Sequence, residues 1–256
     1  MCLIRLEDVS KIYVSGEEKV AAVSGLSLEV ESGEFVAVTG PSGCGKSTLL
    51  HMIGGLSRPS SGSISVCGKS LYQRTQSGLA QYRRRYVGIV YQFYNLVPEL
   101  TARENLILPA LMDGRRADEE WVDEIFEILG MEDKKDVYPG RLSGGQQQKI
   151  AVGRALVNRP PLLLADEPTG NLDNNNAWEI MRLMEEINDR GTTVVVVTHN
   201  VEIVKAMNKR VITMRKGVIV DDTGADEEYS GTSWDMDDDL SGDGYVDDGE
   251  DDFYED

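Results

Sequence analysis

A glycine-rich segment near the amino terminus has the residue types that bind phosphate. It follows an apolar run at residues 35–38 and precedes an apolar segment that begins at Leu49. Between a strand and a helix, glycines let backbone N–H groups surround phosphate oxygens, a lysine adds positive charge, and a serine offers its hydroxyl to Mg²⁺. This predicts a P-loop rather than a plain glycine-rich turn, and the nearby His51 is expected to be structural. The P-loop residues are Gly40, Pro41, Ser42, Gly43, Cys44, Gly45, Lys46, Ser47 and Thr48.

Three further polar side chains follow apolar runs. Asp166 and Glu167 come after the run at residues 162–164, and His199 comes after the run at 193–197. Because parallel sheets bind ligands at the carboxyl ends of their strands, we expect all three at one site. Asp166 would hold Mg²⁺, Glu167 would orient and deprotonate the water that attacks the γ-phosphate, and His199 would reach the same phosphate. Alternatively, one of the acids only caps the next turn.

A second glycine-containing segment offers another anion site. Here a serine stands at a predicted helix N-cap, followed by two glycines and a long helix with an apolar face. One ATP has a single γ-phosphate, which the P-loop already holds, so the second site suggests that two chains share each nucleotide. The segment consists of Leu142, Ser143, Gly144, Gly145 and Gln146.

A framework of alternating strands and helices must position these motifs. Short apolar runs separated by helical segments indicate an α/β domain. Two of the runs, 162–164 and 194–197, are apolar on consecutive positions, as expected at the centre of a mainly parallel sheet. Other patterns predict a helix over 118–129 that ends at Gly130, a helix over 177–187, and a terminal hairpin over 211–220. The runs are residues 26–30, 35–38, 64–66, 87–90, 162–164 and 193–197.

The charge of the chain is concentrated in its last residues. The 256 residues include 26 Lys and Arg and 44 Asp and Glu, a net charge of −18, yet residues 221–256 hold 17 of the acids and no base. Residues 1–220 therefore have 26 basic and 27 acidic side chains, an ordinary balance for a folded domain. No apolar run is long enough to cross a membrane or to serve as a signal peptide, and three cysteines without metal-type spacing fit reduced thiols. These features predict a cytoplasmic protein.

In their order along the chain, these motifs resemble those of the nucleotide-binding subunits of ATP-binding cassette (ABC) transporters. The resemblance covers residues 2–220 and includes Walker A at 40–48, Walker B at 162–166 and the LSGGQ signature at 142–146, together with Gln92 of a Q-loop and Asp173 of a D-loop. It implies an ABC-type P-loop NTPase: a mainly parallel sheet, an antiparallel β subdomain, and a helical subdomain at about residues 96–157.

The resemblance also implies roles for residues outside the P-loop. Two subunits would pack head to tail, each giving its signature motif to the ATP on its partner's Walker A. Tyr13, after the first strand, would stack on adenine, although a strand-edge tyrosine is the alternative. Gln92 would sense Mg²⁺ and the attacking water. Residues 93–97 would meet a coupling helix of an integral-membrane permease on the cytoplasmic face of the membrane, or else belong to the helical core.

Two branches of the family match different parts of the chain. Residues 91–109 and 165–173 resemble the branch of macrolide exporters, lipoprotein-release systems and antimicrobial-peptide resistance. Residues 178–181, 191–193 and 198–204 are instead similar to the cell-division ABC ATPase. The chain would then power export or extraction of an amphiphilic substrate, or regulate envelope or division enzymes without transport. The sequence leaves open whether the dimer is a homodimer. A nucleic-acid partner is not expected, because the body has no basic surplus.

The acidic segment at 221–256 has its own alternatives. It has too few apolar residues to form a core, so disorder is the first expectation. One stretch has oxygen ligands at the spacing of an EF-hand loop, which would bind Ca²⁺. A solubilising tail and an electrostatic tether to the permease are further possibilities. The calcium ligands would be Asp239, Ser241, Asp243, Asp247 and Glu250.

Overall fold

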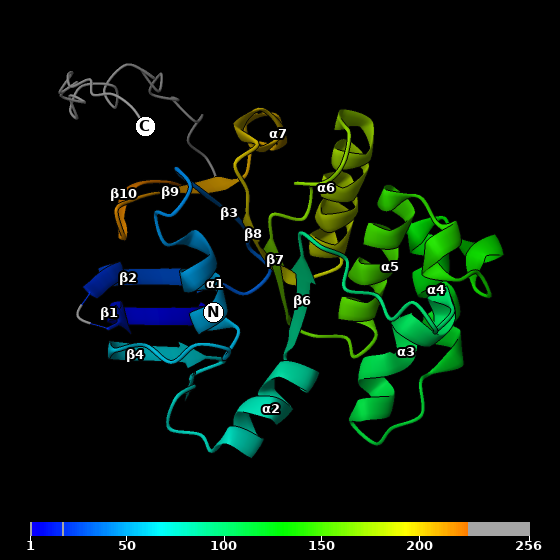
Figure 1. The fold of residues 1–256 in the computed structure, drawn as a ribbon, viewed down its shortest axis with the longest axis horizontal. Helices are drawn as coiled ribbons and strands as arrows, with labels where there is room; N and C mark the ends of the chain where they lie inside the picture. The colour runs from blue at the N-terminus through cyan, green and yellow to red at the C-terminus, as the bar shows by residue number, and fades with distance from the viewer. Residues whose placement is uncertain (1, 17, 225–256) are drawn as a thin grey trace, which may run out of the picture.

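The computed structural model describes residues 2–16 and 18–224, which form two β-sheets with helices between and around them (Figure 1). The smaller sheet is antiparallel, in the order β2-β1-β4-β5. The run at 26–30 belongs to a much longer strand, and Tyr13 lies inside the first strand rather than after it, because the two long strands continue together to the turn at Gly16. The strands are β1 (Cys2–Ser15), β2 (Glu18–Glu31), β4 (Ser61–Val66) and β5 (Lys69–Ser70).

The larger sheet has the order β10-β9-β3-β8-β7-β6. All neighbouring strands in it are parallel except β10, which pairs antiparallel with β9 as the predicted hairpin. The parallel arrangement brings the carboxyl ends of β3, β6, β7 and β8 to one edge, where the P-loop and the predicted acids follow. The strands are β3 (Phe35–Thr39), β6 (Val87–Tyr91), β7 (Leu162–Asp166), β8 (Thr193–Val197), β9 (Arg210–Arg215) and β10 (Val218–Thr223).

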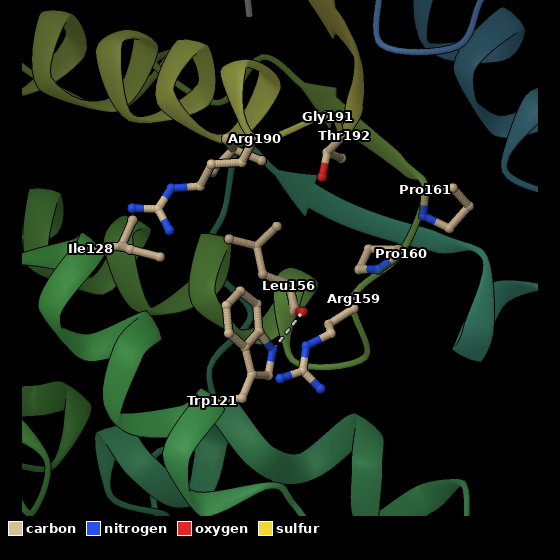
Figure 2. A pocket seen from close by; sticks show the side chains of 10 residues that line it. Trp121, Ile128, Leu156, Arg159, Pro160, Pro161, Arg190, Gly191 and Thr192 are labelled. Carbon is tan, nitrogen blue, oxygen red and sulfur yellow. Dashed lines mark hydrogen bonds between the residues drawn. The ribbon is translucent and has the colours of Figure 1, made fainter.

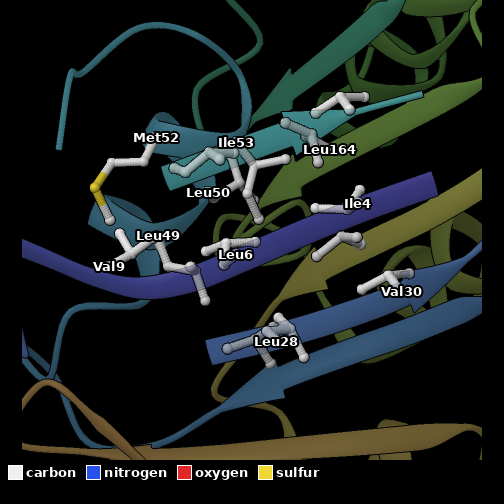
Figure 3. Close-up of a cluster of buried hydrophobic side chains, with 14 of the residues drawn as sticks. Ile4, Leu6, Val9, Leu28, Val30, Leu49, Leu50, Met52, Ile53 and Leu164 are labelled. Atoms are coloured by element: carbon white, nitrogen blue, oxygen red, sulfur yellow. The ribbon is translucent and has the colours of Figure 1, made fainter. Parts of the chain in front are cut away.

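The consecutive apolar residues of the central strands separate two hydrophobic cores. Leu162 and Leu164 of β7 join the core that contains α1 and the antiparallel sheet, part of which is seen in Figure 3. Leu163 and Ala165 point the other way and join the core formed with the helices. Successive strand residues face opposite sides of a sheet, so a strand covered on both faces must be apolar throughout. The prediction for these strands is confirmed.

The helices lie on both sides of the larger sheet. In Figure 1, α3, α4 and α5 lie across it from the antiparallel sheet. Among the described residues, the chain between β6 and β7 contains helices and turns but no strand. Helix α4 begins after the N-cap Asp118 and ends at Gly130, whose φ of 60° suits glycine, as predicted. The helices are α1 (Lys46–Ile53), α2 (Gln76–Arg85), α3 (Ala102–Met112), α4 (Glu119–Leu129), α5 (Gly144–Leu156), α6 (Asn174–Asp189) and α7 (Val201–Met207).

The end of the folded body differs from the expected boundary at residue 220. Strand β10 continues to Thr223, so Asp221 and Asp222 belong to the sheet and not to the acidic segment. Asp221 and Asp222 pair with Thr213 and Ile212 of β9, and an ion pair joins the two strands, with Arg210 Nη2 and Asp222 Oδ2 2.7 Å apart. The hydrogen bond from Arg210 to Asp222 raises the pKa of the guanidinium. Residues 225–256, including the predicted calcium loop, lie outside the described residues.

No helix within residues 2–16 and 18–224 has the length and apolar character needed to span a membrane.

Candidate nucleotide site

The P-loop connects β3 to α1 and passes between the backbones of two other strands. Gly40 has a φ of 141° and Gly45 a φ of 107°. A Cβ on Gly40 would lie 2.2 Å from the carbonyl oxygen of Met214, and one on Gly45 would lie 2.2 Å from that of Ala22. Both obstacles are backbone atoms, which cannot move aside as a flexible side chain would. Glycine is therefore required at both positions, because φ is positive there and because the backbone of another strand lies too close for a Cβ.

Lys46 brings its positive charge into the loop that precedes it. It is the first residue of α1, and its side chain turns back so that Nζ donates to the carbonyl oxygens of Gly40 at 2.8 Å and Pro41 at 3.0 Å. The residue is only 7% exposed. A cation and the amino end of a helix thus act at the same place, which favours a bound anion such as phosphate.

Ser47 and Asp166 form the pair expected of a magnesium site. Ser47 Oγ donates to Asp166 Oδ1 at 2.8 Å, across the gap between α1 and the end of β7. Hydroxyl and carboxylate oxygens are the ligands that Mg²⁺ accepts in nucleotide sites, so the residues present fit this ion. His51 Nε2 also lies 3.7 Å from Asp166 Oδ2. The sequence did not predict this contact, which arises because one turn of α1 brings His51 above Ser47.

Glu167 and His199 meet at the ends of adjacent strands, as predicted. His199 Nδ1 is 2.8 Å from Glu167 Oε2, and the backbone N–H of His199 donates to the same oxygen at 3.3 Å. Glu167 has a φ of 50°, which is uncommon for a residue with a side chain. Its own N–H donates to the carbonyl of Val197 in β8. The carboxylate is therefore held at the same edge as Asp166 and Ser47.

Gln92 follows β6 at this edge, and its side chain contacts the loop after Glu167. The amide nitrogen of Gln92 is 3.4 Å from Asn171 Oδ1, and Asn171 Nδ2 donates to the carbonyl oxygen of Gln92 at 3.1 Å. The side chain also packs against Gly170. In this structure Gln92 is thus bound to the loop after Glu167, and neither Ser47 nor Asp166 is its hydrogen-bond partner.

The signature segment caps α5 and does not join the P-loop. Ser143 Oγ accepts from the N–H of Gln146, and Gln146 Oε1 accepts from the N–H of Ser143, which together form a capping box. A Cβ on Gly145 would lie 2.3 Å from Asn176 Oδ1, and one on Gly144 would lie 2.7 Å from the hydroxyl of Tyr94. Within the described ranges, no hydrogen bond or ion pair links residues 142–146 to the P-loop.

Asp173 of the D-loop caps α6. Its Oδ1 accepts from the backbone N–H of Asn176 at 2.9 Å. That hydrogen bond lowers the pKa of the Asp173 carboxyl. Asn176 therefore contacts both the signature glycine Gly145 and the D-loop aspartate, a role that the sequence did not predict because it depends on how α5 and α6 pack.

Tyr13 lies in β1 near the P-loop. It pairs with Val20 of β2, and two residues further along β2 the carbonyl of Ala22 contacts Gly45. The tyrosine is 44% exposed, and the ammonium of Lys11 lies 4.9 Å from its ring centroid. An exposed ring in this position could stack on a base whose phosphates occupy the P-loop.

A separate hollow of about 320 Å³ lies away from these residues. Figure 2 shows Trp121 and Arg159 at one side of it, with the indole N–H donating to the carbonyl of Leu156. Pro161 and Thr192, which also line it, directly precede β7 and β8. The hollow is thus at the amino ends of these strands, whereas the predicted site residues follow the carboxyl ends.

Comparison with known proteins identifies the family. A family model described as ABC transporter matches residues 23–170, from the middle of β2 to the loop after Glu167. The chain belongs to the ABC transporter family. Its P-loop fold is that of an ABC ATPase cassette, and members of this family use Mg²⁺ together with ATP.

The chain is similar to proteins of known name and structure over most of its length. An uncharacterized ABC transporter ATP-binding protein of Thermotoga maritima is 46% identical over 86% of this chain and 99% of that protein. The macrolide export ATP-binding/permease protein MacB of Escherichia coli K12 is 40% identical over 90% of this chain but only 36% of MacB. The ATP-binding cassette MJ0796, in a dimeric post-hydrolysis state with ADP and Pi, aligns with a TM-score of 0.79 at 36% identity over 87% of this chain and 99% of that one.

Proposed function

We propose that the chain hydrolyses ATP to drive a separate membrane permease, through closure of a dimer on the nucleotide. The observation that carries the proposal is the meeting of four side chains at the carboxyl edge of the larger sheet: Ser47 contacts Asp166, and Glu167 contacts His199. Its substrate would be amphiphilic, such as a drug, a peptide antibiotic or a lipoprotein. The likeness to MacB, whose name describes macrolide export, supports this class.

Each side chain of the site has a chemical task in this proposal. The P-loop N–H groups and Lys46 bind the phosphates of ATP. Ser47 and Asp166 would hold Mg²⁺, which neutralises charge on the phosphates when bound. Glu167 accepts a proton from the attacking water, and His199 orients the glutamate through Nδ1. The His199 side chain is exposed and would be available to the γ-phosphate. Gln92 would move from Asn171 to the ion and the water as the site closes.

The signature segment supports a shared site in a dimer. It lies at the capped amino end of α5, whose first turn has no acidic residue, and in this chain it faces Tyr94 and Asn176. A helix amino end favours a bound anion, and within the described residues no hydrogen bond or ion pair joins this one to the P-loop of the same chain. We propose that a second copy of the chain brings its signature to the ATP on this P-loop, with Tyr13 stacked on adenine.

The surface next to the Q-loop has the character of a docking surface for the permease. Phe93 is 68% exposed and Met112 is 70% exposed, both unusual for such apolar side chains. Met112 borders a hollow of about 200 Å³ that is also lined by Arg154. Arg154 donates to the carbonyls of Tyr94 and Asn95, so the hollow adjoins the Q-loop segment. A permease helix docked there would sense the position of Gln92, and the chain would be held at the cytoplasmic face of the membrane.

Purification of the full-length chain from detergent-solubilised membranes tests this function. The chain should recover an integral-membrane permease, and Phe93→Asp should reduce recovery at least about tenfold because a charge would be buried in the interface. Val220→Asp is the matched control: Val220 is also exposed, at 54%, but lies on the edge strand β10. Recovery of no membrane protein, or equal loss with both variants, would contradict the proposal.

A further inference from the structure

Gln148 is a buried polar side chain on α5, the helix that begins in the signature segment and is called the signature helix below. It connects this helix to the loop after β6 and the loop after β7, which are called the catalytic loops below. It lies on α5, five residues after Ser143, and is 0% exposed. Its amide nitrogen donates to the carbonyl oxygen of Tyr91 at 3.2 Å and to that of Pro168 at 2.7 Å. Tyr91 directly precedes Gln92, and Pro168 directly follows Glu167. One amide group thus holds the backbone next to the Q-loop glutamine and next to the Walker B glutamate.

The orientation of this amide follows from its neighbours. Two carbonyl oxygens face one end of the side chain, and only the NH₂ group can donate to both. The Oε1 atom at the other end is buried, and no partner for it occurs among the described residues. A buried acceptor without a hydrogen bond is costly and needs an explanation. Here the NH₂ group donates to the carbonyl oxygens of Tyr91 and Pro168, and this orientation leaves the amide oxygen without a hydrogen bond.

The backbone that Gln148 holds is strained. Glu167 has a φ of 50°, and a non-glycine residue keeps such a conformation only where its surroundings hold it there. On one side the N–H of Glu167 donates to Val197. On the other side Pro168 has no N–H, so its carbonyl is the group through which the loop can be tied. That carbonyl accepts the shorter of the two hydrogen bonds from Gln148.

We propose that Gln148 is a positioning residue for ATP hydrolysis. It sets the place of the Glu167 carboxylate and of Gln92 relative to the signature helix, so that a movement of α5 changes the position of the base. The role given to Gln148 rests on the role proposed above for Glu167. In a dimer, binding of the partner's ATP at the signature would reach the base of the same chain through this amide.

The test replaces the amide while keeping its volume. In the full-length protein, Gln148→Met removes both donors, and Gln148→Glu keeps the shape but replaces the NH₂ group by a carboxylate oxygen. Both variants should lower kcat by about 10- to 100-fold through misplacement of the base. The KM for ATP should change by less than about threefold, because the P-loop contacts remain.

Gln147→Met is the matched control. Gln147 is the neighbouring glutamine on α5, and its amide also donates to a carbonyl, that of Leu142 at 3.1 Å, but it reaches neither catalytic loop. Its kcat should stay within about twofold of the wild type. In a Glu167→Gln background, Gln148→Met should have a much smaller further effect on the residual rate, because only the positioning of Gln92 then remains to be lost.

The outcomes separate the two proposals. If Glu167→Gln hydrolyses ATP at the wild-type rate, the role of Glu167 fails whatever the Gln148 variants do. If Glu167→Gln is inactive but both Gln148 variants turn over like the wild type, only the role of Gln148 fails. Three other results would also overturn it, because the amide would then serve the fold alone. They are equal losses for Gln147→Met and Gln148→Met, a fold-loss from Gln148→Met that is as large in the Glu167→Gln background as in the wild type, and failure of both Gln148 variants to fold.

Discussion

The P-loop and the signature segment are both glycine-rich and each includes the start of a helix, yet they need glycine for different reasons. In the P-loop, Gly40 and Gly45 have positive φ angles and touch the backbones of other strands. In the signature, Gly144 and Gly145 belong to α5, and their neighbours are the side chains of Tyr94 and Asn176. One segment requires a backbone shape, and the other requires space for specific side chains.

The two segments also differ in the groups that surround them. Around the P-loop lie a cation, a hydroxyl, two carboxylates and a histidine, which are kinds of side chain that suit phosphoryl transfer to water. The amino end of α5 at the signature has no charged residue in its first turn, and the carboxylate of Asp173 is connected to it only through Asn176. Under the proposed function, the P-loop would hold the chemistry of hydrolysis, and the signature would complete the site of a partner. Four changes can break or sharpen this contrast.

Glu167→Gln should have the largest effect. The amide cannot take a proton from water, so kcat should fall by about 10²- to 10⁴-fold, while ATP binding is kept because Lys46 and the P-loop are untouched. Steady-state ATPase assays and equilibrium binding of a fluorescent ATP analogue measure the two quantities. Glu132→Gln, at an exposed acid of the helical region, is the control. Retention of turnover would remove Glu167 from the mechanism.

Alanine substitutions in the P-loop and in the signature should distinguish a glycine needed for its backbone conformation from a glycine needed to leave space for a neighbouring side chain. Gly40→Ala should reduce ATP affinity at least about tenfold, and trimming neighbouring side chains cannot rescue it because the obstacle is a backbone carbonyl. Gly145→Ala should slow hydrolysis with ATP binding retained. The double variant Gly145→Ala, Asn176→Ala should regain most of the rate, because the atom 2.3 Å away is then absent. Lack of rescue would show that the signature glycine is needed for more than space.

Mixing two inactive variants should restore part of the activity. Lys46→Ala disables the P-loop, and Ser143→Arg obstructs the partner's nucleotide. A heterodimer of the two has one site with an intact P-loop and an intact signature. Random pairing should restore roughly a quarter of the wild-type rate per chain, since half of the dimers are mixed and each has one working site. If mixing restores nothing although heterodimers are detected by differential tagging, the shared site is wrong.

Tyr13→Ala should have the smallest effect. Loss of a stacked ring should raise the KM for ATP about fivefold with little change in kcat. Tyr13→Phe should keep the wild-type KM, because the ring remains. Val14→Ala removes the next exposed side chain of β1 and serves as control. If Tyr13→Ala and Val14→Ala behave alike, Tyr13 is only a strand-edge tyrosine.

The sequence predicted the parts of the site that depend on local order along the chain. The P-loop, the acids after β7 and His199 after β8 could be located because each follows a buried strand, and parallel strands bring their carboxyl ends together. The caps at Ser143 and Gly130 could be predicted because capping needs only neighbouring residues. For the same local reason, the alternation of apolar runs was enough to predict the mainly parallel sheet.

The sequence alone thus determined which motifs exist and which strands must be buried on both faces. Tertiary structure decided the rest: that Gln92 binds Asn171, that Asn176 lies against Gly145, that Gln148 joins the two catalytic loops, and that Asp222 belongs to the sheet through Arg210. Each of these contacts joins residues from different elements, and their distances follow from how α5, α6 and the strands pack. Residue type and spacing encode which group can donate or accept a hydrogen bond, but only packing selects the partner.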